Sequence, residues 1–286
     1  MRAPYRWEAA LIAVAAIWGS TFTVVQDAVE RIPPFLYLSL RFALATVVMV
    51  AFGAARGITR TEATAGALIG TALFAGYAFQ TVGLQYTSAS NAGFITGMFV
   101  VFTPLLGAIA LRVLPSRAAT AGVVLSTTGL VLLAMPAGFT MGGGDALEVM
   151  TAISFAVHIL LISRLAPGLS AVRLTTVQLA TAAVLTTLWT ATAERHPIPT
   201  DGFVWFAIVF TAVFATAVAF AIQTRAQQHI PPVRTAVILT AEPVFAGIFG
   251  FAVAGDRLGA RGYAGAALIV VGILVAELGA SARERL

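Results

Sequence analysis

Two octapeptides, Val101–Ala108 (VFTPLLGA) and Thr240–Gly247 (TAEPVFAG), each place a proline in the middle of a long apolar run. Downstream of them, Gly122–Gly129 is matched by Gly265–Gly272, with a glycine at both ends of each segment. The chain therefore reads as one unit that has been duplicated. A proline removes one backbone hydrogen bond from a helix. We expect both prolines where a neighbouring helix or a polar cavity compensates for that loss.

The composition indicates a membrane protein. Of the 286 residues, 59% are hydrophobic and 10% are charged, and the mean hydropathy is +0.93. A soluble domain carries about 25% charged residues, so lipid must cover the apolar excess. The net charge is +5, but the 17 basic residues stand singly between apolar runs, which excludes nucleic acid as a partner. The chain has no cysteine, which excludes disulfides and thiolate metal sites.

Ten stretches are long and apolar enough to cross a bilayer as helices, since a crossing needs about 20 residues. These stretches predict an all-α membrane protein with spans at 8–28, 34–54, 63–84, 90–111, 117–135, 144–164, 170–191, 202–224, 232–253 and 261–279.

The arginines predict the orientation of these spans. If the N-terminus is cytoplasmic, twelve of the 17 basic residues fall inside. Only Arg31, Arg195, Arg257 and Arg261 fall outside, and Arg41 lies within a span. The positive-inside rule therefore favours two cytoplasmic termini. Each half, 1–136 and 137–286, holds five spans, and because five is odd the second half enters the membrane inverted. Inverted repeats allow one architecture to open alternately to either side.

Two charged residues inside spans have both structural and functional interpretations. Arg41 could bind the carboxylate of a substrate, although we favour a structural anchor that bonds backbone carbonyls or a carboxylate. Glu242 precedes Pro243 where the first half has Thr103, and it is the only carboxylate expected well inside a span. It could couple protons, contact a substrate ammonium group, satisfy the groups freed by the proline, or pair with Arg41.

The remaining candidates are polar and aromatic residues within spans. His158 is more often a buried neutral histidine bonded to another helix than a cavity residue. The repeat counterpart of Arg41 is uncharged, since Gln178 stands where Arg41 would fall in the second half. A pocket for a small amphipathic molecule needs aromatic rings with a few hydroxyls and amides. The candidates of that kind are Trp18, Ser20, Tyr77, Gln80, Asn91 and Thr96.

Small residues and prolines predict where helices pack and bend. The pair Gly66 and Gly70 is typical of close helix contacts in lipid. Gly97, Pro104 and Pro243 are predicted hinges or helix breaks. No HExxH, Gly-x-Ser-x-Gly or phosphate-binding loop occurs, so we predict no enzyme activity and no cofactor. His158, His196 and His229 fall at different predicted depths, so no shared metal site is expected.

Four short motifs carry a resemblance to a known family: Trp18-Gly19-Ser20, Leu40-Arg41-Phe42, Tyr86-Thr87-Ser88-Ala89 and Glu242-Pro243-Val244. As a set they resemble the drug/metabolite transporter superfamily, and most closely its EamA-type ten-helix branch. The resemblance covers nearly the whole chain, as two units at roughly 10–135 and 147–276. The family pattern often ends the fourth helix with Gly-Glu. Here Leu111-Arg112 stands there, whereas the second unit keeps Gly255-Asp256.

The resemblance implies a ten-helix basket around a central cavity formed by both halves, in which the Leu-Arg-Phe and Glu-Pro motifs are structural or mechanistic. We therefore expect a multi-pass secondary transporter of the bacterial inner membrane. It would export amino acids or similar small amphipathic metabolites by alternating access. Alternatives are an uptake or drug-type efflux carrier, a channel-like protein, or a membrane protein without transport activity. Since one chain holds both halves, a monomer or weak dimer is expected.

Overall fold

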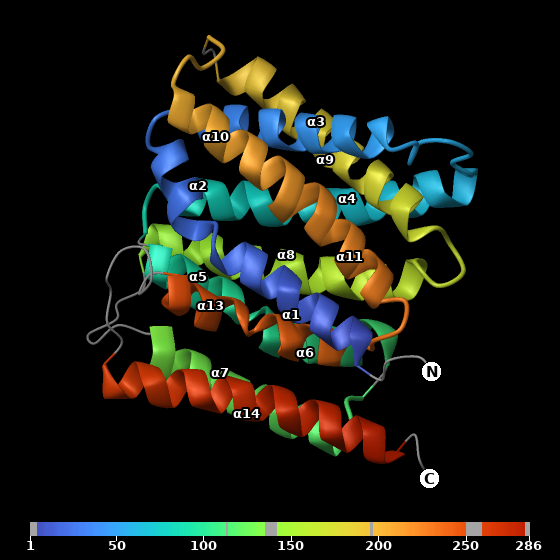
Figure 1. Ribbon diagram of the computed structural model, residues 1–286, viewed down its shortest axis with the longest axis vertical. Coiled ribbons are helices and arrows are strands. Elements are labelled where there is room, and N and C mark those ends of the chain that lie inside the picture. Colours follow the sequence, from blue (N-terminus) through green and yellow to red (C-terminus); the bar gives the residue numbers. More distant parts are fainter. Residues whose placement is uncertain are drawn as a thin grey trace.

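The computed structural model describes residues 5–87, 89–112, 114–134, 142–194, 197–249 and 259–283. Its regular elements are all helices (Figure 1). Up to residue 134 they are α1 (Arg6–Gly19), α2 (Phe22–Val29), α3 (Pro34–Ala51), α4 (Arg60–Gly83), α5 (Ala89–Gly97), α6 (Phe99–Leu111) and α7 (Arg117–Ala134). Beyond it they are α8 (Gly143–Leu165), α9 (Ala171–Ala193), α10 (Gly202–Phe210), the π-helix η1 (Thr211–Val218), α11 (Ala219–Ala226), α12 (Pro232–Leu239), α13 (Glu242–Phe249) and α14 (Ala260–Arg283).

Nine stretches of the described chain are long and apolar enough to cross a membrane, and several consist of two helices in line. The one expected span that is not among these nine is 117–135. It holds α7, whose apolar stretch, Arg117–Leu133, is shorter. An all-helical membrane fold is therefore confirmed. The count of ten, the inversion and the side of the termini stay predictions.

Three of the spans are interrupted near their middle. The interruptions lie at Ser20–Thr21 between α1 and α2, at Met98 between α5 and α6, and at Thr240–Ala241 between α12 and α13. At the first, Ser20 Oγ donates to the Ile17 carbonyl over 2.7 Å and Thr21 Oγ1 donates to the Trp18 carbonyl over 2.8 Å. The Trp18 carbonyl also accepts the Thr21 amide, so side-chain and backbone donors together serve the carbonyls at this interruption, as lipid cannot.

The prolines do not coincide with these interruptions. Gly97 is the last residue of α5, and Pro243 is the second residue of α13. Pro104 was predicted to be a hinge or a helix break. The break is wrong, because α6 runs through Pro104 without interruption, and the hinge stays a prediction. The carbonyl that Pro104 leaves without an N–H donor is that of Val100, in the first turn after Met98. There the helix has only just restarted, so this turn can tilt away from the proline ring.

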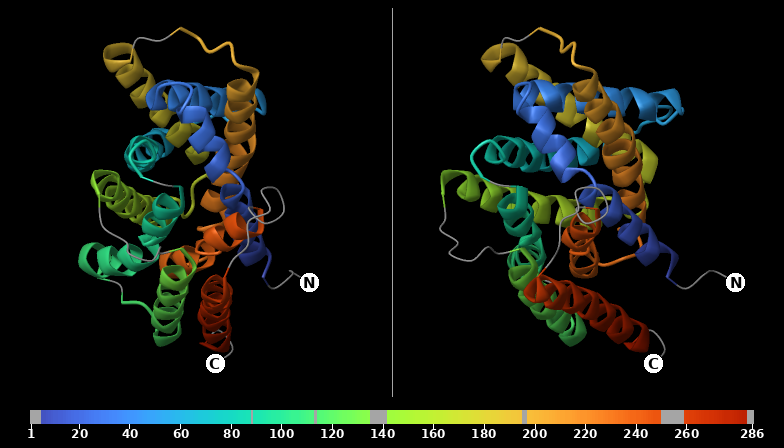
Figure 2. Two further views of the ribbon diagram at one scale, coloured as in Figure 1. Left: turned by 90° about the vertical axis from the view of Figure 1, so that its left-hand side faces the viewer. Right: turned by 60° about the vertical axis from the view of Figure 1, so that its left-hand side comes forward.

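The packing of helices rests on small residues and forms two large apolar cores and a smaller one between α4, α8 and α9. A Cβ at Gly66 would lie 2.6 Å from Val177 Cβ, and one at Gly70 would lie 2.5 Å from the Gln178 carbonyl. These two glycines therefore let α4 approach the α9 backbone closely, as predicted for the pair. One core gathers around α1, α5, α8 and α12, and the other around α3, α4, α9 and α10. Helices α7 and α14 pack side by side at one end of the molecule (Figure 2).

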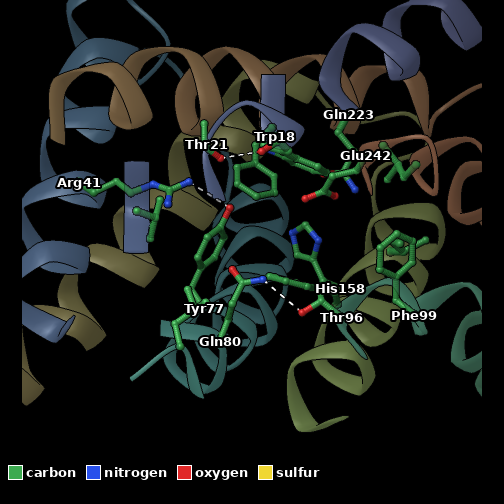
Figure 3. Close-up of a pocket in the computed structure, with 16 residues that line it drawn as sticks. Trp18, Thr21, Arg41, Tyr77, Gln80, Thr96, Phe99, His158, Gln223 and Glu242 are labelled. Atoms are coloured by element: carbon green, nitrogen blue, oxygen red, sulfur yellow. Dashed lines mark hydrogen bonds between the residues drawn. The ribbon is translucent and has the colours of Figure 1, made fainter. Parts of the chain in front are cut away.

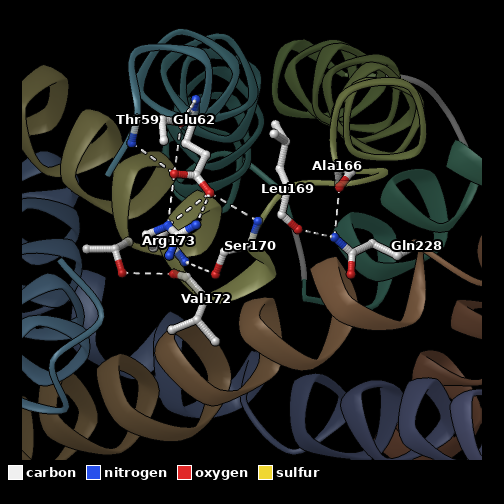
Figure 4. A network of polar contacts seen from close by, with 9 residues as sticks. Thr59, Glu62, Ala166, Leu169, Ser170, Val172, Arg173 and Gln228 are labelled. Carbon is white, nitrogen blue, oxygen red and sulfur yellow. Dashed lines mark hydrogen bonds and ion pairs between the residues drawn. The ribbon is translucent and has the colours of Figure 1, made fainter. Parts of the chain in front are cut away.

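Ion pairs join the ends of the helices. Glu62, in the first turn of α4, accepts hydrogen bonds from Arg173 Nε over 2.9 Å and from the Ser170 amide over 3.1 Å (Figure 4). Arg31, before α3, pairs with Asp201 at the start of α10 over 2.8 Å. Arg234 of α12 pairs with both Glu8 of α1 and Glu277 of α14. The start of α1 and the last turns of α14 therefore lie at the same end of the bundle (Figure 1).

Candidate functional site

A cavity lies between the two large apolar cores. Its walls come from α1, α2, α3, α4, α8, α11, α12 and α13, together with the adjoining ends of α5 and α6 (Figure 3). The structure brings most of the predicted site residues together there: Trp18, Arg41, Tyr77, Gln80, Thr96, His158 and Glu242.

Arg41 is held from two sides. Its side chain is 2% exposed. Nε donates to Thr216 Oγ1 of η1 over 2.7 Å, and one terminal nitrogen donates to the Tyr77 hydroxyl over 3.1 Å. Its guanidinium carbon lies 4.6 Å from the centre of the Tyr77 ring. A guanidinium has five N–H donors, so these two bonds fix its direction without exhausting its capacity to bind an anion.

The predicted ion pair between Arg41 and Glu242 is not present. Among the described residues, no ion pair within 4.0 Å involves either group. The Tyr77 hydroxyl lies on the Arg41 side of the cavity and Glu242 lies across from it (Figure 3). Tyr77 takes the bonding position that a carboxylate would have held. The cavity therefore presents a cation and a carboxylate on different walls.

The π-helix η1 accepts hydrogen bonds from side chains of the surrounding helices. A π-helix widens the turn and releases backbone carbonyls, and such segments occur often at functional sites. Here Trp18 Nε1 donates to the Ala215 carbonyl over 2.9 Å, and Thr216 receives Arg41. The Tyr37 hydroxyl bonds Thr211 Oγ1 over 2.8 Å. Helices α1 and α3 are thus both anchored to one irregular segment beside the cavity.

Glu242 enters the cavity where two interruptions meet. A Cβ at Gly19 would lie 2.6 Å from the Glu242 carbonyl oxygen and 2.8 Å from the Ala246 nitrogen, so the end of α1 touches the α13 backbone. No hydrogen bond joins the Glu242 carboxylate to a residue that the structure describes. Nearby, Gln223 Oε1 is buried and also lacks a partner within the described part of the chain. This wall therefore carries polar atoms that nothing in the fold uses.

His158 combines both of its expected roles. It is 1% exposed and its Nε2 bonds Gln178 Oε1 over 2.9 Å, which is the expected bond to another helix. Gln178 Nε2 in turn donates to Thr224 Oγ1 over 3.1 Å. Gln178, the repeat counterpart of Arg41, thus orients a histidine at the cavity wall. His229 instead stacks on Trp7 with ring centres 4.7 Å apart, and His196 lies outside the described residues.

Two predicted residues do not line the cavity. The Ser20 hydroxyl is used within its own interruption, as described above. Asn91 lies in the first turn of α5, more than one turn before Thr96 reaches the cavity. The position of each residue in its span was right, but the direction of its side chain depends on how the helices are turned.

Sequence reasoning missed several residues of the lining, most of them apolar or aromatic: Val25, Leu84, Phe99, Phe155, Ile159, Phe220, Gln223 and Leu239. Gln223 carried a usable signal, since it is an amide within an apolar run. The aromatic residues did not, because phenylalanine is as common facing lipid as facing a cavity.

Glu242 was expected to be the only carboxylate well inside a span, but a second carboxylate is buried near the end of its span. Glu148 of α8 is 0% exposed, and its Oε2 accepts a hydrogen bond from Thr96 Oγ1 over 2.9 Å. It lies behind Thr96, beyond the cavity lining. Its nearness to the end of its span hid it from the sequence pattern.

Comparison with known proteins identifies the chain. The model of the EamA-like transporter family matches residues 5–135 and again residues 143–278. The chain belongs to the EamA-like transporter family. The resemblance seen in the four motifs is thereby confirmed, and the protein is a membrane transporter of the drug/metabolite superfamily. Such a transporter acts on a small-molecule substrate within a lipid bilayer.

Relatives of this EamA-like protein are named only as transporters. One from Archaeoglobus fulgidus, an uncharacterized transporter, is 34% identical over 94% of this chain and 84% of its own length. Another, the uncharacterized transporter YyaM of Bacillus subtilis, is 25% identical over 93% of this chain and 92% of its own. A solved crystal structure superposes with a TM-score of 0.79 and 24% identity, covering 96% of this chain and 98% of that one, which shows a shared fold.

Leu111-Arg112, which stands where the family pattern often has Gly-Glu, lies at the C-terminal end of α6. Arg112 caps α6 in the left-handed conformation, with φ 53°. The corresponding Gly255-Asp256 pair of the second half lies outside the described residues.

Proposed function

We propose that this EamA-like protein is a ten-span secondary transporter of the bacterial inner membrane that exports amino acids or similar small amphipathic metabolites. Transport proceeds by alternating access through the central cavity, between two inverted halves at 1–136 and 137–286. Both termini are cytoplasmic, and the chain works as a monomer or weak dimer.

The packing of α7 against α14 supports the inverted repeat. A Cβ at Gly122 would lie 2.8 Å from the Gly272 carbonyl, and a Cβ at Gly129 would lie 2.6 Å from the Gly265 carbonyl. In the sequence repeat, Gly122 corresponds to Gly265 and Gly129 to Gly272. Exchanging the halves therefore turns one contact into the other. That is the behaviour of a pair of helices that cross on a two-fold axis in the membrane plane.

The position of the chain ends supports ten spans. Arg234 pairs with Glu8 near the start of α1 and with Glu277 near the end of α14. A chain that starts and finishes at one end of a bundle crosses the membrane an even number of times. With α7 counted as a short span, the nine longer stretches become ten.

The cavity supports an amino acid as cargo, and one observation carries this proposal. A single cavity has a guanidinium, Arg41, on one wall and a carboxylate, Glu242, on another, and the two are not paired with each other. A zwitterion offers a carboxylate to the first and an ammonium group to the second. Aromatic walls from Trp18, Phe155 and Phe220 suit an apolar side chain.

The test uses purified protein in proteoliposomes preloaded with a mixed pool of amino acids and metabolites, with and without a pH gradient. Mass spectrometry of the lumen should show loss of neutral amino acids. Amino-acid amides, which lack the carboxylate, and N-acetyl amino acids, which lack the ammonium group, should compete at least about tenfold more weakly, because each forfeits one charged contact. Arg164→Gln, at an exposed position on α8, is the control variant.

The outcomes separate the candidate functions. Loss of no solute contradicts export. Loss of apolar cations without a carboxylate, with amino acids retained, favours the drug-type efflux carrier. Equal competition by amides and acids removes Arg41 as the carboxylate contact while leaving transport in place.

A further inference from the structure

Glu148 is a second buried carboxylate that neither the fold nor the cavity accounts for. It lies in the second turn of α8 and is 0% exposed. Its Oε2 accepts the Thr96 hydroxyl over 2.9 Å, and its Oε1 has no hydrogen-bond partner among the described residues. The ion pairs found in the described part of the chain use Arg31, Arg173 and Arg234, none of them with Glu148.

The neighbouring acid shows the contrast. Asp145, one turn earlier, caps α8 through the Gly142 amide over 2.8 Å and accepts the Thr87 hydroxyl over 2.6 Å. Those bonds give it a structural task. Glu148 has no such task, although an unpaired carboxylate buried in protein costs several kcal/mol. A group kept at that cost is a functional candidate.

The space around Glu148 is built to hold a carboxyl group. A Cβ at Gly83 of α4 would lie 2.6 Å from Glu148 Oε1, so only glycine leaves room there. The nearest titratable side chain is Asp145, on the same helix. Of the helices packed on α8, α5 and α6 have no titratable residue. The titratable residues of α4 are Arg60 and Glu62, in its first turn at the opposite end from Gly83, and Tyr77. Glu62 pairs with Arg173, and the Tyr77 hydroxyl accepts a hydrogen bond from Arg41.

Helix α12 also packs on α8 and offers Glu148 no partner. Its only charged side chain, Arg234, is bound to Glu8 and Glu277. The environment of Glu148 is therefore neutral apart from Asp145. In such surroundings the ligand that a carboxylate accepts at least cost is a proton.

Thr96 connects this carboxyl group to the cavity. Thr96 lines the cavity, and Gln80 Nε2, also in the lining, donates to Thr96 Oγ1 over 3.4 Å. A hydroxyl has one proton to donate and two lone pairs. While Glu148 is ionised, Thr96 gives its proton to Glu148 and keeps a lone pair for the cavity. When a proton from water forms an O–H bond on Oε2, the acid donates to Thr96 Oγ1, and the threonine proton turns toward the cavity.

We propose that Glu148 and Thr96 form a proton-binding site behind the cavity wall that competes with the ammonium group of the cargo. The proposal rests on the proposed function. In the ionised state, Thr96 offers an acceptor and Glu148 a nearby negative charge, and both attract an ammonium group. Protonation removes the charge and replaces the acceptor by a donor. Proton and cargo therefore exclude each other, so inward proton flow drives cargo out.

The first experiment is infrared titration of the purified wild-type protein. It should show the band of a protonated carboxylic acid that appears on acidification. This band should be absent from Glu148→Gln and present in Glu30→Gln, an exposed matched control. The band should move in Thr96→Val, which cannot hydrogen-bond. It should stay in Thr96→Ser and in Thr128→Val, whose hydroxyl bonds only its own helix at an exposed position on α7.

Each result decides a part of the proposal. A spectrum of folded Glu148→Gln that retains every carboxylic acid band overturns the proton site. A band lost in Glu148→Gln but unmoved in Thr96→Val overturns the relay through Thr96. Neither of these infrared results depends on transport. A failure of the proposed function would therefore be recognised separately, because the proteoliposomes would lose no solute.

The second experiment tests competition in the preloaded proteoliposomes, with the amino acid that leaves fastest. Competition with one proton predicts that its apparent affinity falls up to about tenfold for each unit of acidification. Glu148→Gln should remove that dependence. A pH dependence equal in Glu148→Gln and wild type overturns the competition.

Discussion

Gly19→Ala perturbs the contact between the interrupted first span and α13. The added Cβ would lie 2.6 Å from the Glu242 carbonyl oxygen, 2.8 Å from the Ala246 nitrogen and 2.9 Å from Phe245 Cβ. Two of these neighbours are backbone atoms that no rotamer change can move. Restoring an ordinary contact of 3.4 Å requires α1 and α13 to separate by about 0.8 Å. Overpacking of this kind costs about 1–3 kcal/mol.

Unfolding in detergent, titrated with a denaturing surfactant and followed by tryptophan fluorescence, measures this cost. Gly19→Ala should lower the free energy of unfolding by about 1–3 kcal/mol. Gly202→Ala is the matched control, since a Cβ there meets nothing within 4 Å and its φ is not positive. Its effect should stay within about 0.5 kcal/mol. If the two variants were equally stable, the close approach of α1 to α13 would be refuted.

Three further predictions concern contacts outside that interface. Trp18→Phe removes the indole donor from a carbonyl of η1, so it should cost about 1–2 kcal/mol in the same unfolding assay, and an unchanged value would contradict the anchoring of α1 on η1. Gly129→Ala and Gly272→Ala, which the repeat makes equivalent, should destabilise equally, each by about 1–3 kcal/mol, because each clashes with the backbone of the other helix; unequal effects would argue against a two-fold contact. The Arg31 guanidinium beside Asp201 holds the pKa of that carboxyl below its ordinary 3.8. This pair therefore stabilises the fold above about pH 4 and loses its effect as the pH falls through the lowered pKa. Melting temperatures from pH 5 to pH 3 should fall slightly more for wild type than for Asp201→Asn, which keeps the helix cap, and salt should erase the difference.

The sequence predicted the spans well because burial in lipid is a one-dimensional signal. Every predicted span contains helix in the structure, and the polar groups within spans were visible as exceptions. The exceptions near span ends were harder to interpret. Glu148 lies six residues into α8, where a carboxylate could equally have faced water. Its burial follows from the approach of Gly83 and Thr96, which come from α4 and α5.

The interruptions were predicted less well than the spans. Proline is the obvious candidate for a break, yet α6 continues through Pro104 while the chain turns at Met98. A helix breaks where a partner can take over its freed backbone groups, and that partner is remote in sequence. The π-helix η1 is the clearest case, since its carbonyl at Ala215 is satisfied by Trp18, 197 residues away.

By itself the sequence determined that the chain lies in a membrane, that it is helical and repeats, and which family it resembles, because hydropathy and short motifs are local properties. It also named seven residues that meet at the cavity. Only the tertiary structure decided how those residues are paired: Arg41 with Thr216 and Tyr77, and His158 with Gln178. The direction of a side chain depends on the rotation of its helix against its neighbours. That rotation is set by close backbone contacts, such as those at Gly19 and Gly70, which no single span encodes.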